Sequence, residues 1–391
     1  MWDRLDDWLD EMPAAAAVER LASELQKQGD LASLFQAWLL GERMRLGLPA
    51  VMPADDEALT RQQRDDYEEA IRVQARRIGQ LFLDRGDIPG AWPYFRLIGE
   101  LAPLAMALEQ LPLPSDDAVE LALHLAIAEN VHPVWGYRLL LERRGVCSAI
   151  TQFGQRPPPA ASARHECLQL IIQHLHDELR ERLRSDVATR AGLPAADLAS
   201  ASVAELLGHL AGRETDDWAH LDVSHLGSVL QYAVELPRGT DFEKLLDLCR
   251  YGERLPQRWQ PVGDPPFESG CVDYLHFFRT LAGQEVERGL EHFRAKAETY
   301  ADQAEVTAPG EVVVHLLAEL GRPAAALEAY GRYLSHADRR ALTCISAEEL
   351  SRRCGGFAAL AGLAQRRGDL VGYAAARLAE LGKPAEKLAR P

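Results

Sequence analysis

Two imidazoles and a carboxylate lie close together in the segment His220-Leu221-Asp222-Val223-Ser224-His225. Imidazole nitrogens and carboxylate oxygens are the ligands that Zn, Fe and Mn ions take in proteins, so His220, Asp222 and His225 are candidate metal ligands. They are also candidate catalytic residues, because a carboxylate can orient an imidazole that exchanges a proton. The spacing matches no established motif. A helix start capped by Asp222 or Ser224 and flanked by two polar histidines explains the segment without any chemistry.

A second segment, Gly263-Asp264-Pro265-Pro266-Phe267-Glu268, places two carboxylates around a double proline. Proline stiffens the backbone, which suits a preorganised catalytic site. Acidic residues also favour the first turn of a helix, so the segment is equally explained as a helix entry. Asp264 and Glu268 join the catalytic candidates if this loop meets the histidine segment in space, and the sequence leaves that open.

Motifs of the common cofactor-dependent and hydrolytic enzymes are absent. The sequence has no Walker glycine loop, no dinucleotide fingerprint after a strand, no H-E-x-x-H and no G-x-S-x-G. We therefore predict no cofactor, and a divalent metal only under the enzymatic alternative. Whether the protein catalyses any reaction stays open.

Charge and composition limit the possible partners and compartments. The formal net charge of −16 argues against nucleic acid, because phosphate binding needs a basic surface. Six widely spaced cysteines without a C-x-x-C pair indicate reduced, buried thiols. The acidic start of the chain lacks the features of a signal peptide, and no segment is apolar enough for a membrane span. We therefore expect a cytoplasmic protein that binds no membrane.

Helical periodicity runs through almost the whole chain. In residues 68–83, four apolar residues fall on one helical face at spacings of four, three and four: Ile71, Ala75, Ile78 and Phe82. The next stretch repeats the pattern with Ala91, Phe95, Ile98 and Ala102. Period-two alternation, which would indicate strands, is nearly absent. The sequence predicts an all-α protein.

Short turns separate these amphipathic stretches. At Gly86-Asp87 the glycine can adopt the left-handed conformation that ends a helix, and the aspartate can cap the next helix. The same pair occurs at Gly29-Asp30 and Gly368-Asp369, and Gly321-Arg322-Pro323 is a variant in which proline suits the first helical turn. Turns this short allow only antiparallel packing, so we predict stacked helical hairpins.

The segment Gly321-Arg322-Pro323-Ala324-Ala325-Ala326-Leu327-Glu328-Ala329-Tyr330 resembles the middle of a tetratricopeptide repeat, in which a turn glycine precedes a small residue and an aromatic. Gly368-Asp369 with Tyr373, and Gly86-Asp87 with Ala91 and Phe95, resemble it too. The resemblance covers hairpin turns near the two ends of the chain. It implies a degenerate tetratricopeptide-like α-solenoid.

Two proline-rich linkers divide the chain. Residues 155–162 contain three consecutive prolines that cannot be helical, and residues 255–267 form a second excursion. We therefore expect three regions: N-terminal hairpins at 1–156, a less regular central helical block at 157–305, and C-terminal tetratricopeptide-like hairpins at 306–391.

The favoured function is an interaction scaffold, because stacked hairpins form extended grooves that bind a protein or peptide partner. The alternative is a metal-dependent or acid–base enzyme with its site in the central block. A third arrangement closes the helices into an α/α toroid around a substrate cavity. The identity of the partner or substrate and the oligomeric state stay open.

Overall fold

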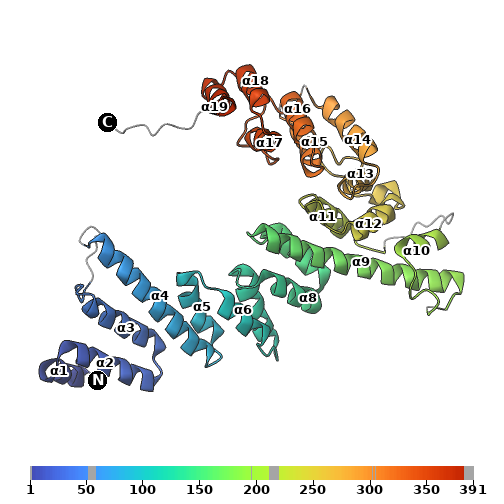
Figure 1. The fold of residues 1–391 in the computed structure, drawn as a ribbon. Helices are drawn as coiled ribbons and strands as arrows, with labels where there is room; N and C mark the ends of the chain where they lie inside the picture. Colours follow the sequence, from blue (N-terminus) through green and yellow to red (C-terminus); the bar gives the residue numbers. More distant parts are fainter. Residues whose placement is uncertain are drawn as a thin grey trace. The chain divides into compact units, whose positions relative to one another are not determined.

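A computed structural model describes residues 2–51, 59–194, 196–210, 220–301, 303 and 305–382 (Figure 1). All regular elements among these residues are helices, and consecutive helices pack together as hairpins, which confirms the predicted all-α class. The chain divides into two compact units, residues 1–140 and 141–391. The expected region boundaries near residues 157 and 305 stay predictions.

The described residues of the first unit form seven α-helices, a π-helical turn at His124–Ala128 and the start of α8 (Pro133–Gln155). The seven are α1 (Trp2–Glu11), α2 (Ala14–Gln28), α3 (Leu31–Arg45), α4 (Arg61–Leu83), α5 (Ile88–Ile98), α6 (Ala102–Glu109) and α7 (Asp116–Leu123). From α1 to α6, each helix packs against the next one in sequence.

The glycine–aspartate turns form as predicted in this unit. Gly29 and Gly86 have φ values of 78° and 73°, in the left-handed region that favours glycine. Asp30 then accepts a hydrogen bond from the backbone N–H of Ser33 at 3.0 Å. Asp87 likewise accepts one from the N–H of Gly90 at 2.9 Å. Each aspartate satisfies a donor that the start of its helix leaves unpaired, so the turn determines where the helix begins.

Helices α4 and α5 pack closely because of one glycine. A Cβ atom at Gly79 would lie 2.6 Å from the ring of Phe95, so no larger residue fits there without displacing the ring. Ala75, Ile78 and Ala91 are buried as the periodicity predicted. The predicted extension of the second stripe to Ala102 is wrong, because Gly99 ends α5 and Ala102 begins α6.

In the second unit, the part of the chain that the structure describes forms the end of α8 and eleven further α-helices. They are α9 (Ala161–Ala191), α10 (Val203–His209), α11 (Val223–Ala233), α12 (Glu243–Glu253), α13 (Cys271–Leu281), α14 (Val286–Thr299), α15 (Ala308–Glu319), α16 (Pro323–Tyr333), α17 (Ala347–Cys354), α18 (Ala358–Arg366) and α19 (Leu370–Glu380). The long α9 packs against α10, α11 and α12, and from α11 onward each helix contacts its successor (Figure 1).

Both predicted linkers interrupt the helices of this unit. Residues 156–160 separate α8 from α9, and residues 254–270 contain only a 3₁₀ turn at Gln257–Trp259 before α13 begins. The predicted turns form as well. Pro323 is the first residue of α16, and Asp369 accepts a hydrogen bond from the N–H of Gly372 at 2.8 Å. The hairpins that the sequence predicted are therefore present in both units.

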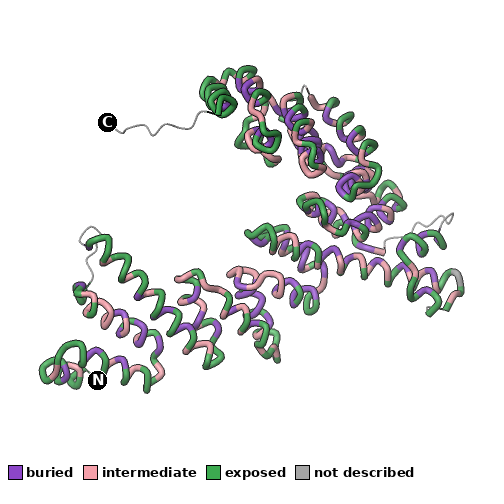
Figure 2. The backbone as a smooth tube through the Cα atoms, in the orientation of Figure 1, coloured by how far each residue is buried: buried purple, intermediate pink, exposed green. Residues whose placement is uncertain are grey.

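Buried and exposed residues alternate along most helices, as the burial-coloured tube shows (Figure 2). Each helix buries an apolar stripe against its neighbours, as expected for amphipathic hairpins. Among the described helices, none is long and apolar enough to cross a membrane. Cys167, Cys249 and Cys271 are buried, whereas Cys147 and Cys354 are exposed, so the expectation of buried thiols was wrong for those two.

Candidate functional site

A cleft of about 950 Å³ lies in the second unit. Its walls come from the end of α8, from α11 and α13, from α15, and from the loops at 261–267 and 343–344. The walls include four aromatic and four proline side chains: Phe153, Tyr232, Phe267 and Tyr274, with Pro157, Pro261, Pro265 and Pro266. Mostly apolar walls with a few polar groups are typical of ligand-binding clefts.

The loop at 261–267 is held firmly against the helices. The Phe267 ring stacks on that of Tyr274, with centroids 4.4 Å apart and planes 11° apart. The backbone N–H of Phe267 donates to the carbonyl oxygen of Asp264 at 2.8 Å. At the surface of this loop, the side chain of Val262 is 83% exposed. Val262 therefore presents an exposed apolar side chain on a rigid loop of the cleft.

Some charged groups of the cleft are paired within the protein, and others are not. Nε of Arg164 lies 2.9 Å from Oε2 of Glu235, and the same guanidinium donates to the carbonyls of Pro158 and Pro159. Asp264 is exposed, and its carboxylate makes no hydrogen bond or ion pair with the residues that the structure describes. One predicted catalytic residue, Asp264, thus lies in the cleft with its charge available.

Glu311 is a cleft residue whose carboxylate is already used. Its Oε2 accepts hydrogen bonds from the backbone N–H and the hydroxyl of Thr343, at 2.6 and 2.7 Å, and from the N–H of Cys344 at 3.1 Å. Its Oε1 accepts a further one from the Thr307 hydroxyl at 2.8 Å. This buried carboxylate therefore fastens the 343–344 loop to α15.

His315, on α15, is the cleft's histidine. Its ring stacks parallel to that of Phe277, and its Nε2 is buried with no hydrogen-bond partner among the described residues. Burial lowers the pKa of His315 below its ordinary value of 6.5, because desolvation disfavours the charged form. The ring is therefore neutral at pH 7 and adds no positive charge to the cleft.

Glu268 lies at the edge of a separate network between α13 and α14. Its two carboxylate oxygens accept hydrogen bonds from Nζ of Lys296 at 2.6 Å and from the hydroxyl of Tyr300 at 2.9 Å. Lys296 also donates to Oδ2 of Asp273 at 2.8 Å. The side chain of Asp273 has no exposure to solvent. One ammonium thus joins two carboxylates from consecutive parts of the chain.

His292 completes the shell around Asp273. Its Nε2 lies 2.7 Å from Oδ1 of Asp273, and the backbone N–H of Ser269 donates to Oδ2 at 2.7 Å. Burial alone would raise the pKa of Asp273, but the hydrogen bonds from His292 and Lys296 outweigh it and hold the pKa below its ordinary value. Because both oxygens are occupied, the network stabilises the fold and leaves no carboxylate free for catalysis.

His220 is fixed in a third place, at the entry to α11. Its Nε2 lies 3.3 Å from Oδ2 of Asp186 on α9, and its side chain is only 10% exposed. Its backbone is held as well: the N–H donates to the hydroxyl of Tyr251 at 2.8 Å, and the carbonyl accepts from Arg182 at 2.8 Å. These contacts give His220 a structural role in joining α9 to α11.

Asp222 and His225 line a smaller cavity of about 370 Å³ that also contains His174, Glu178 and Cys147. Asp222 caps α11 as predicted: Oδ1 accepts hydrogen bonds from the Ser224 hydroxyl at 2.6 Å and from its N–H at 2.8 Å. Those bonds lower the pKa of Asp222, so it is a carboxylate at neutral pH. His225 thus shares a cavity with a histidine from α9, which the sequence did not pair with it.

The five predicted residues therefore occupy four surroundings rather than one site. Asp264 lies in the large cleft, Asp222 and His225 line the small cavity, and His220 and Glu268 are engaged in separate contacts. Within the described residues, no three His, Cys, Asp or Glu side chains are placed to hold a metal ion. The five do not assemble into the single site that converging loops would have formed.

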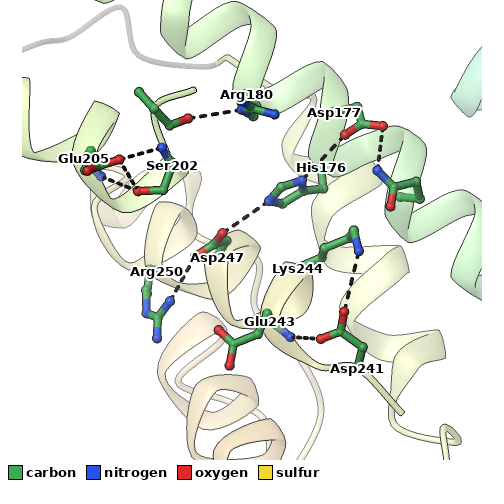
Figure 3. Close-up of polar contacts among 12 residues, drawn as sticks. His176, Asp177, Arg180, Ser202, Glu205, Asp241, Glu243, Lys244, Asp247 and Arg250 are labelled. Carbon is green, nitrogen blue, oxygen red and sulfur yellow. Dashed lines mark hydrogen bonds and ion pairs between the residues drawn. The ribbon is translucent and has the colours of Figure 1, made fainter. Parts of the chain in front are cut away.

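A histidine that the sequence analysis did not select, His176, joins α9 to α12 (Figure 3). Its Nε2 lies 3.2 Å from Oδ2 of Asp247, whose other oxygen accepts from Arg250 at 2.9 Å. Both partners are mostly buried, at 13% and 19% exposure, so the contact holds the central helices together.

Lys296 and its neighbours were not predicted from the sequence either, although their spacing indicates that they lie together. His292, Lys296 and Tyr300 are spaced four residues apart, which places them on one face of α14 and its end. Lys296 is one of only five lysines in the chain, in which most basic residues are arginine. A lysine at a polar position of a helix is therefore a noticeable feature of this sequence.

Comparison of the chain with protein-family models, with curated proteins and with solved structures finds no match.

Proposed function

We propose that this protein is a helical-hairpin scaffold that binds an extended peptide segment of a partner protein in the large cleft of its second unit. The observation that carries the proposal is the cleft itself, about 950 Å³ with walls of aromatic and proline residues from several successive elements. Aromatic grooves bind extended peptides because flat rings contact side chains over a large area with little loss of conformational entropy.

Two further features support peptide binding. The loop at 261–267 is anchored by the Phe267–Tyr274 stack, so little entropy is lost when a partner binds to it. Val262 exposes an apolar surface at this rigid point and provides an anchor for an apolar side chain of the peptide. The likeness of the hairpins to tetratricopeptide units belongs to the same proposal and rests on their Gly–Asp turns. Six free cysteines support the proposed cytoplasmic location.

The experiment pans the full chain against a library of short randomised peptides displayed on phage and measures the affinity of enriched peptides by fluorescence anisotropy. Val262→Asn replaces the anchor with a neutral polar residue. We expect about tenfold weaker binding, which corresponds to the free energy of burying one valine side chain. The matched control is Val51→Asn, since Val51 is 85% exposed in the first unit. Enriched peptides that bind both variants equally well would refute the proposal.

One observation favours a second candidate function, acid–base chemistry in the small cavity. Asp222 and His225 line it together with His174 and Glu178, which are groups that transfer protons. A thermal-shift screen of small polar compounds tests this candidate. If the candidate is correct, a compound that raises the melting temperature of the unmodified chain should have no effect on His225→Ala and its full effect on Val262→Asn. A compound that still stabilises His225→Ala argues against this candidate.

A further inference from the structure

We infer that the peptide bound in the large cleft is basic: it places an apolar residue on Val262 and a lysine or arginine beside Asp264. This inference rests on the proposed function and adds the chemistry of the partner. It starts from the charges of the cleft walls, which comprise one arginine, Arg164, and three carboxylates, on Glu235, Asp264 and Glu311.

The arginine of the cleft is not available to an acidic partner. Its guanidinium is shared between the carboxylate of Glu235 and the carbonyls of Pro158 and Pro159. Arg164 thereby fastens the linker between α8 and α9 to the first turn of α9, and Glu235 neutralises its charge. His315 contributes no compensating charge, because its pKa is lowered by burial. No other cationic side chain lines the described walls of the cleft.

The three carboxylates of the cleft differ in whether other groups of the protein already bind them. Glu311 is saturated by four hydrogen bonds from Thr307, Thr343 and Cys344, and Glu235 already has Arg164. Asp264 is exposed, and the described residues supply no partner for its carboxylate. A carboxylate without a partner in a concave, partly apolar site attracts a cation, because the surrounding walls reduce screening by water.

Val262 and Asp264 lie on the same loop of the cleft. Asp264 follows Val262 by two residues on the same loop, so an apolar anchor and a negative charge are offered side by side. Gly263 between them is closely packed, since a Cβ there would lie 3.0 Å from the carbonyl oxygen of Phe267. The tight loop fixes the spacing of the two features, and a peptide with neighbouring apolar and basic residues matches both. The chain's net charge of −16 further favours encounter with a basic partner.

The test uses the full chain and peptides enriched in the library selection, each synthesised with its lysines intact and with norleucine in their place. For the lysine peptides we expect about fivefold weaker binding to Asp264→Asn than to the unmodified chain. Their affinity should also fall with added salt, and less steeply in that variant. The norleucine peptides should bind both proteins equally. Asp241→Asn is the control, because Asp241 is an exposed acid outside the cleft.

The outcomes separate the two proposals. If enriched peptides lack lysine and arginine, or bind Asp264→Asn unchanged while Val262→Asn weakens them, peptide binding stands and the basic partner is refuted. If Val262→Asn has no effect on any enriched peptide, the cleft is not the peptide site, and both proposals fail.

Discussion

Nζ of Lys296 lies 2.8 Å from Oδ2 of Asp273, a carboxylate that solvent does not reach. The lysine comes from α14 and the aspartate from α13, and Lys296 also pairs with Glu268 just before α13. A buried carboxylate is costly unless charge and hydrogen bonds compensate for its lost hydration. This contact therefore makes the α13–α14 hairpin depend on one ammonium group.

Replacing Lys296 with methionine removes that ammonium and keeps most of the side-chain volume. We expect a loss of about 3 kcal/mol in the free energy of unfolding, because Asp273 stays buried without its ammonium partner. Urea denaturation followed by circular dichroism measures the change.

The matched control for this variant is Lys244→Met. Lys244 is 34% exposed and pairs with Asp241 at 3.7 Å within one helical turn, so its removal should cost less than about 0.5 kcal/mol. Equal effects of the two substitutions would show that the Lys296 network contributes no more than a surface ion pair.

The stability supplied by this network should depend on pH. The pKa values of Asp273 and Glu268 lie below their ordinary values of 3.8 and 4.5, since hydrogen bonds and Lys296 outweigh the effect of burial. A carboxylate with a depressed pKa stabilises the fold fully above its ordinary pKa, and this contribution is lost as the pH falls through the folded-state pKa. The destabilisation caused by Asp273→Asn should therefore shrink as the pH falls from about 5 towards about 2. A constant difference over that range would contradict the assignment.

The ring of His315 should titrate below 6.5, because burial lowers its pKa. Since the unfolded chain binds the proton more readily, the neutral ring's contribution to stability is complete above pH 6.5 and declines as the pH falls. Titration of the ring protons by NMR measures this pKa, with His315→Phe identifying the signal. A midpoint at or above 6.5 would rule out the buried, unpaired state of Nε2.

Thiol reactivity should follow the burial of the cysteines. Cys147 and Cys354 are exposed, whereas burial raises the pKa of Cys167 to about 12 and leaves little thiolate. With iodoacetamide on the folded protein, we expect alkylation of Cys147 and Cys354 well before Cys167, Cys249 and Cys271. Mass spectrometry of tryptic peptides at increasing times gives the order, and early labelling of Cys167 would contradict this packing.

Several features of the protein could be predicted from the sequence because they are local. The left-handed glycine and capping aspartate at Gly86-Asp87 depend on residues within one helical turn. The capping of α11 by Asp222 is local for the same reason. The buried stripe of α4 follows from the 3.6-residue period, and the proline linkers follow from a missing N–H donor. These features led to the correct all-α class and to the correct hairpins.

Long-range pairings were decided only by the tertiary structure. The sequence placed His220, Asp222 and His225 together, yet the fold turns His220 toward Asp186 and His225 toward a cavity shared with His174. Glu268 is drawn to Lys296, 28 residues later, and Asp264, four residues before it, remains in the cleft. Proximity in sequence determines which residues share a turn of helix. Which side chains meet across helices depends on how each hairpin packs against the next, because a rotation of one helix about its axis carries every side chain to a different neighbour.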